Sequence, residues 1–160
     1  MNASQWETLR RCARGEDVGH QPVALIVDSP WIPGFLGLST IDYLTMPEVW
    51  RTANLEVARR FADAILLPGF WVEIGMTAEP SAFGCKVSFY PDRPPAAHPI
   101  TEDLEPVIAG GVPNPATDGF LPLVLNFYRH QEPRVNDAGH RIKMVAARGP
   151  LIERHARTYP

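Results

Sequence analysis

The sequence has little of what marks a secreted, membrane-spanning or nucleic-acid-binding protein. Only two cysteines occur among its 160 residues, Cys12 and Cys85, which is too few for a disulfide framework and favours a reducing compartment. No apolar run approaches the roughly 18 residues that a membrane helix needs. Residues 1–14 are polar and charged, unlike a signal peptide. We therefore expect a cytoplasmic protein with no membrane partner.

Positive charge is also scarce. Lys and Arg total 15 against 18 Asp and Glu, which gives a net charge of -3 and a pI of about 5.9. A basic surface for nucleic acid is therefore not expected. Apolar residues make up 45% of the chain, as in ordinary globular proteins, and its length suits one domain with a hydrophobic core. We expect a single domain over residues 1–160, in which a proline-rich stretch between Pro91 and Pro133 is irregular.

Three apolar segments predict the strands of a parallel sheet. Residues 23–27 and 64–67 are continuous apolar runs, typical of strands covered on both faces, and residues 143–147 form the third. Between the first two, residues 47–61 carry apolar side chains at three- and four-residue steps, which predicts an amphipathic helix that begins at Pro47. The order strand, helix, strand indicates a βαβ unit.

Weaker patterns predict three further elements. Residues 4–14 have the spacing of a short helix, with Ser4 and Glu7 as a capping box and Gly15 as its end. Residues 86–90 alternate like a short outlying strand, and residues 121–130 are expected to be helical. We see no internal repeat.

Several short pieces of the sequence between about residue 23 and residue 150 form a familiar pattern: Pro47-Glu48, Arg59-Arg60-Phe61, residues 63–67, residues 76–85 and Gly149-Pro150. Together they resemble the uroporphyrinogen decarboxylase family, which also contains the cobalamin (corrinoid) methyltransferases. The segment 76–85 (MTAEPSAFGC) is the most specific and looks like the methyltransferase branch. The resemblance implies an α/β fold that is the N-terminal part of a TIM (β/α)8 barrel, incomplete in this chain because such a barrel takes roughly 250 residues.

The resemblance also implies a tetrapyrrole ligand, and two reactions remain open. Uroporphyrinogen decarboxylases carry an arginine-rich loop after the first strand, because arginine binds the substrate's carboxylates. Here residues 28–35 (DSPWIPGF) contain no arginine and one acid, Asp28. Corrinoid-dependent methyl transfer is therefore favoured over strict decarboxylation, which stays as the alternative. In the methyltransferase branch, zinc is held by a His-x-Cys pair and a later cysteine. The resemblance places these ligands in the second half of a full-length parent, with a corrinoid, and a corrinoid protein as a further partner; no metal ligands are expected here.

Three carboxylates are candidate catalytic groups. Asp28 ends the first predicted strand, and Glu73 and Glu79 follow the second. The carboxyl ends of strands are where parallel α/β enzymes build their sites. Glu73 lies among apolar residues that would raise its pKa and suit it to moving protons. The alternative for each acid is a loop or helix cap, and Glu79 is preferred to Glu73 because it lies inside the best family match.

Four other residues are candidates for substrate binding. Trp31 and Phe35 would give apolar surface for a flat macrocycle, although such residues more often cover a barrel end. Phe70 lies near the place where the resemblance puts an aspartate that faces the pyrrole nitrogens. Arg148 ends the third strand and would bind a carboxylate, or pair with a structural acid.

Residues 151–160 do not continue the family pattern, so we expect a truncated or frame-shifted gene product. An unfinished barrel leaves apolar strands exposed, and each large aliphatic side chain left in water forfeits about 1.5–3 kcal/mol. The chain is accordingly expected to self-associate and to be inactive alone. A non-catalytic remnant that assembles with a partner is the third functional hypothesis.

Overall fold

The computed structural model describes residues 1–27, 31–67 and 69–144 as a mixed α/β fold. The elements in chain order are α1 (Ala3–Ala13), β1 (Val23–Ile26), α2 (Trp31–Leu36), α3 (Thr40–Thr45), α4 (Pro47–Arg60), β2 (Ala64–Leu67), β3 (Phe70–Val72), α5 (Ala78–Ala82), β4 (Lys86–Ser88), β5 (Ala96–His98), α6 (Glu105–Ala109), α7 (Leu121–Asp137) and β6 (Ile142–Met144). The predicted helix at residues 47–61 and the predicted strand at 64–67 are confirmed.

Parallel pairing joins three successive stretches of chain. β1 pairs with β2 in the register Val23↔Ala64 to Ile26↔Leu67. β3 pairs with β6 in the register Phe70↔Ile142 to Val72↔Met144. Because only residues 68 and 69 separate β2 from β3, the middle stretch pairs with β1 along its first half and with β6 along its second half.

The change of partner takes place at Gly69. Its φ is 125°, and a side chain there would begin 2.5 Å from the carbonyl oxygen of Arg141. The next amide, of Phe70, donates to that same oxygen at 2.9 Å. The prediction that the second strand stops at Pro68-Gly69 is confirmed, since β2 ends at Leu67 and β3 begins at Phe70 with a different partner.

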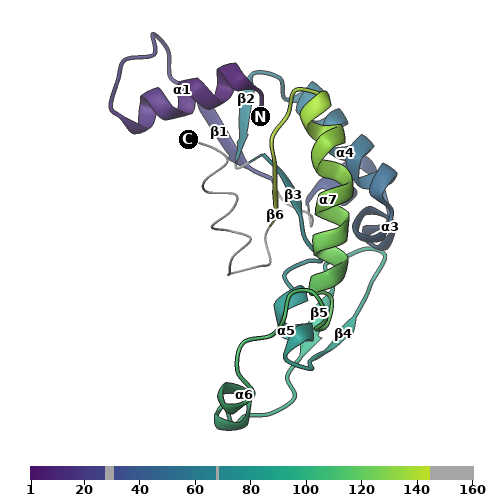
Figure 1. Cartoon of the computed structure of the whole chain (residues 1–160). Helices are drawn as coiled ribbons and strands as arrows, with labels where there is room; N and C mark the ends of the chain where they lie inside the picture. Colours follow the sequence, from purple (N-terminus) through teal and green to yellow (C-terminus); the bar gives the residue numbers. More distant parts are fainter. Residues whose placement is uncertain (28–30, 68, 145–160) are drawn as a thin grey trace.

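Helices α3, α4 and α7 cover one side of the strands, on the right of Figure 1, whereas α1 lies at their upper end. Trp50 of α4 links this layer to the sheet, since its Nε1 donates to the carbonyl of Trp71 at 2.9 Å. Its ring meets Phe70 and Phe127 edge-on, with centroids 6.1 and 5.5 Å apart. The buried core contains Ile32, Tyr43, Leu44, Trp50, Ala53, Val57, Leu66, Phe70, Val72, Ala78, Leu121, Val124, Tyr128, Val135 and Ile142.

Two helix boundaries differ from the predictions. α1 begins after Asn2, whose side chain accepts from the amide of Gln5 while the Gln5 side chain accepts from the amide of Asn2. The capping box is thus Asn2 with Gln5, and Ser4 lies inside the helix. α7 continues past residue 130 to Asp137 because Val135 is fully buried and holds its last turn against the core.

β1 corrects a third prediction, because this strand is not covered on both faces. Val23 is 57% exposed, Leu25 36% and Ile26 74%. Leu25 is in register with Leu66, a core residue beside the helices, so Ile26 points to the opposite side of the sheet. Within the described residues β1 pairs only with β2, so one edge and parts of both faces are left open.

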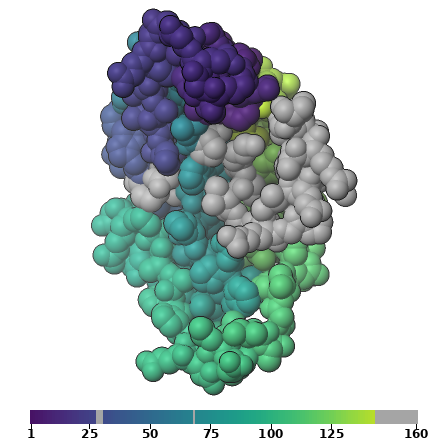
Figure 2. All heavy atoms as spheres, turned by 90° about the vertical axis from the view of Figure 1, so that its left-hand side faces the viewer, coloured from purple at the N-terminus to yellow at the C-terminus, as the bar shows by residue number. Residues whose placement is uncertain are grey.

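Residues 86–120 form an arm that follows α5. It holds the antiparallel pair β4–β5 and the short helix α6, at the bottom of Figure 1. The proline-rich stretch 91–133 is therefore not irregular throughout, since it contains β5, α6 and most of α7. The outlying strand predicted at residues 86–90 is confirmed as β4. Figure 2 shows the molecule from its strand side, with the N-terminal residues in purple at the top and the arm in green at the bottom.

The described part of the chain forms no closed barrel. None of its helices is long and apolar enough to cross a membrane. Several predictions lie outside the described residues, namely those for Asp28, Arg148, residues 145–147 of the third strand and the tail 151–160.

The packing of α4 on the sheet predicts unequal costs for one substitution at two sites. Val57 is 1% exposed and Val112 is 91% exposed. Val57→Ala should lower the free energy of unfolding by about 2 kcal/mol, because it removes buried carbon and leaves a cavity. Val112→Ala should change it by less than about 0.5 kcal/mol. Urea denaturation of both variants measures the difference, and equal costs would contradict the packing.

Candidate functional site

The segment after β3 is a tight turn followed by helix α5. Gly75 and Met76 both have positive φ, 54° and 62°. A side chain on Gly75 would begin 2.5 Å from the ring of Pro95, so only glycine fits there. The hydroxyl of Thr77 closes the turn by donating to the carbonyl of Ile74 at 2.6 Å. A left-handed backbone at a residue other than glycine is uncommon and costs about 1 kcal/mol or more, so packing holds this turn in place.

The arm fastens the other end of this segment. The hydroxyl of Ser81 accepts from the amide of Phe120 at 2.8 Å. Gly119 lies so close to Ser81 and Ala82 that a side chain there would begin 2.4 Å from the amide nitrogen of Ala82. Residues 76–85 are therefore anchored at both ends, which gives a rigid edge beyond the carboxyl end of β3.

One of the predicted catalytic acids, Glu79, lies on this edge, and Glu73 lies just before it. Glu73 directly follows Val72 and is 8% exposed. Glu79 lies in the first turn of α5 and is exposed to solvent. The structure thus gives a buried and an exposed carboxylate on one short stretch of chain.

The predicted aromatic wall lies elsewhere. Trp31 and Phe35 stack on α2 with centroids 4.4 Å apart, 41% and 40% exposed, and both rings contact Phe61. The carbonyl of Phe61 accepts from the amide of Ala64, the first residue of β2. The pair is therefore beside the amino end of β2, whereas Glu73 follows the carboxyl end of β3. The reason is that α2 packs along α4 rather than over the strand ends.

Phe70, the third aromatic candidate, belongs to the core. It is 1% exposed and stacks on His140 with centroids 4.9 Å apart. Its ring also meets Trp50. A side chain enclosed in this way offers no surface to a ligand in this structure, so Glu73 and Glu79 are not joined by any of the three predicted aromatic residues.

A cavity of about 410 Å³ lies where α7 meets the α3–α4 junction and the end of β3. The residues that line it are Leu44, Thr45, Pro47, Val72, Glu73, Ile74, Leu123, Val124, Asn126, Phe127 and His130. His130 is exposed to solvent and also lines this cavity, which the sequence does not predict. The sequence does place Val124, Phe127 and His130 on one face of a helix by their spacing. That spacing does not tell which other part of the chain packs against this face.

Metal binding finds no support in the described residues. No group of three or more His, Cys, Asp or Glu side chains is placed there to hold an ion. Cys12 and Cys85 are both free and partly exposed. These residues therefore do not form the zinc site that the family resemblance implies for a full-length parent.

A cluster of polar groups formed by Met1, His140 and Arg141 lies at the amino end of β6. The terminal amine of Met1 is 3.4 Å from Nδ1 of His140, and the carbonyl of Met1 accepts from the amide of Arg141. Burial, and then the charge of Arg141, lowers the pKa of that amine to about 6. Burial, and then the charge of the terminal amine, lowers the pKa of His140.

Comparison of the chain with protein-family models, with curated proteins and with solved structures finds no match.

The cluster at Met1 and His140 predicts that acid destabilises the fold. Both groups lose proton affinity on folding, so the unfolded chain binds more protons, and stability rises with pH. The free energy of unfolding should increase between pH 6 and 8, the folded and ordinary pKa values of the Met1 amine. His140→Phe keeps a ring against Phe70 and removes a group whose pKa is lowered from 6.5, so the dependence should become shallower below pH 6.5. Denaturation between about pH 5 and 8 measures both slopes; identical slopes below pH 6.5 would exclude His140 as a contributor.

Proposed function

We propose that this chain is the N-terminal part of a TIM (β/α)8 barrel of the uroporphyrinogen decarboxylase family, and that the barrel handles a tetrapyrrole. The observation that carries the proposal is the position of residues 76–85, the stretch most similar to the methyltransferase branch. They form a rigid edge directly beyond the carboxyl end of β3. Parallel barrels build their sites at that end of the strands.

The arrangement of the strands supports the barrel part of the proposal. Three parallel stretches follow one another in chain order, with α4 and α7 on one side. β1 has an open edge with apolar side chains on both of its faces. In a completed barrel this edge would pair with a further strand and both faces would be covered.

Corrinoid-dependent methyl transfer is the reaction we favour. A bound corrinoid would supply the methyl-carrying centre. The edge offers it apolar surface and a hydrogen-bond acceptor, since Met76 is 76% exposed, Phe83 is 41% exposed and Glu79 faces solvent. Glu79 would bind and orient the corrinoid by accepting hydrogen bonds from the amide N–H groups of that ligand. Glu73, which is 8% exposed, is the acid suited to holding a proton away from bulk water.

Decarboxylation of uroporphyrinogen is the second candidate. It would need cations for eight carboxylates, and residues 28–35 supply none. A non-catalytic remnant that assembles with a partner is the third, and the exposed strand β1 is the observation that favours it.

Ligand binding separates the two chemical proposals. The chain, titrated with hydroxocobalamin and with uroporphyrin III, should bind the corrinoid and leave the octacarboxylate unbound. Glu79→Gln should weaken corrinoid binding by roughly tenfold, because a charged acceptor is replaced by a neutral one. Glu102→Gln, which alters an exposed acid on the arm, is the matched control. Preference for uroporphyrin would favour decarboxylation, and binding of neither would argue against a tetrapyrrole.

Reading the gene locus in all frames past codon 150 gives an independent test of the same proposal. Further strand–helix units with a His-x-Cys pair would support a zinc-dependent methyltransferase parent. Strand–helix units without that pair would favour other chemistry, and unrelated sequence would favour the remnant.

Self-association through β1 follows from its exposure. An apolar strand edge without charged residues is a template for pairing with another chain. Ile26→Lys, at a position 74% exposed, should shift the chain toward monomer in sedimentation velocity over a concentration series. Val112→Lys, at a position 91% exposed on the arm, should leave association unchanged. A parent chain that is monomeric at all concentrations would refute the proposal.

A further inference from the structure

The cavity beside α7 lies in the helix layer, apart from the edge formed by residues 76–85. Its volume of about 410 Å³ is in the range of small-molecule sites. Seven of its eleven lining residues are apolar: Leu44, Pro47, Val72, Ile74, Leu123, Val124 and Phe127. Such walls favour a ligand with an apolar body.

The walls of the cavity are well supported. Gln131 is fully buried on α7, and its Nε2 donates to the carbonyl of Pro47 at 3.1 Å, which ties α7 to the start of α4. Phe127 packs edge-on against the buried ring of Trp50. The cavity is therefore a preformed feature of the packed helix layer, and a ligand would not have to open it.

The polar groups of the cavity are unevenly placed. Glu73, at the β3 end, is 8% exposed, whereas Asn126 and His130 on α7 are exposed at the rim. The exposed polar side chains lie at one end of an otherwise largely apolar cavity. They therefore favour an amphipathic ligand whose polar group lies at the rim.

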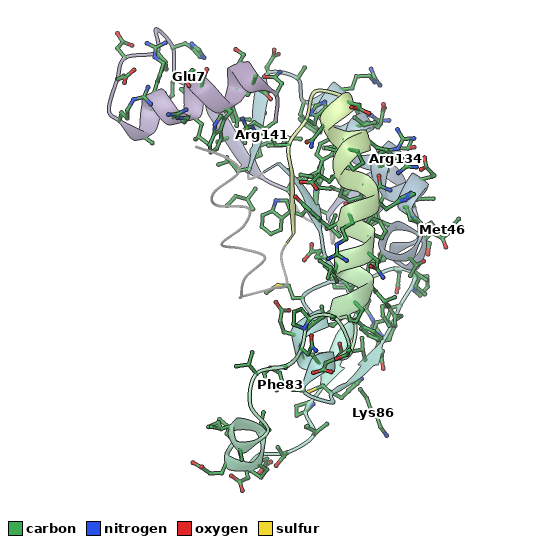
Figure 3. The ribbon with its side chains drawn as sticks, in the orientation of Figure 1. Glu7, Met46, Phe83, Lys86, Arg134 and Arg141 are labelled. Carbon is green, nitrogen blue, oxygen red and sulfur yellow. The ribbon has the colours of Figure 1, made fainter. Side chains whose placement is uncertain are left out.

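His130 has a defined hydrogen-bonding state at this rim. Nη1 of Arg134 lies 3.3 Å from its Nδ1 and 2.6 Å from its carbonyl oxygen. Arginine only donates, so Nδ1 accepts and the ring proton of a neutral His130 is on Nε2. The rim therefore offers an N–H donor with a guanidinium beside it. Figure 3 labels Arg134 on α7 and Met46 at the α3–α4 junction.

One acid competes for the same cations. Glu48 lies near enough to Arg134 and His130 for their charges to contribute to its lowered pKa. The largest cause, however, is its hydrogen bond from Arg51, whose Nη2 is 2.6 Å from Oε2. Because Glu48 is paired with Arg51, the Arg134–His130 pair retains attraction for an anion.

We propose that this cavity binds an amphipathic carboxylate, with its aliphatic body between α7 and the α3–α4 junction and its carboxylate at His130. The carboxylate oxygen accepts from Nε2 of His130, and Arg134 favours its charge. The proposal does not depend on the tetrapyrrole proposal, although Glu73 lines this cavity and also precedes the edge formed by residues 76–85.

Calorimetric titration with three ligands of equal chain length tests the proposal. Decanoate should bind more tightly than decanol, and decylamine more weakly than either. His130→Phe keeps a ring and removes the donor, so decanoate should lose roughly tenfold in affinity while decanol is unchanged. Tighter binding of decylamine would overturn the proposal, because Glu73 would then be the recognising group.

A pair of matched variants locates the ligand. Leu123→Trp introduces a large ring at a wall of the cavity, and Leu104→Trp makes the same change at an exposed position on the arm. Leu123 is 56% exposed and Leu104 is 66% exposed, so neither change disturbs the core. Decanoate affinity should fall at least tenfold in Leu123→Trp and stay at the parent value in Leu104→Trp. Equal affinity in both variants would place the ligand elsewhere and refute the site.

Discussion

The described structure depends on the indole of Trp50, because this one side chain connects α4, β3 and α7. Its N–H satisfies a backbone carbonyl of β3, and its faces and edges pack against aromatic rings from the strand and from α7. A buried indole contributes large apolar area and needs a partner for its N–H, so its position is fixed by both demands. The helix layer, and with it the cavity beside α7, takes its geometry from that position.

A second constraint comes from two glycines at which no side chain fits. Gly69 lies between β2, which pairs with β1, and β3, which pairs with β6, and Gly75 sets the turn against Pro95. Between them, β3 carries the chain from the sheet to the rigid edge at residues 76–85. Backbone geometry, more than side-chain attraction, thus decides where Glu73 and Glu79 are presented.

The strand side and the helix side of the molecule differ in how well their apolar side chains are covered. On the helix side Val57, Val124 and Val135 are excluded from water, and the cavity between α7 and the α3–α4 junction has firm walls. On the strand side β1 leaves Val23 and Ile26 in solvent. This asymmetry is why assembly with further strands and binding of a small ligand are separate properties, which arise from opposite sides of the molecule.

The sequence by itself determined the elements whose signals are local. The helix that begins at Pro47 and the strand at Ala64–Leu67 were predictable because their apolar spacing and their proline boundaries lie within the segments themselves. The acids Glu73 and Glu79 could be placed after a strand for the same reason. Tertiary structure alone decided that β1 is exposed, that Phe70 is enclosed and that Trp31 and Phe35 stack beside Phe61. It also decided that His130 faces a cavity. These outcomes depend on which distant segment lies opposite each residue, and an apolar run or a helical face does not specify its partner.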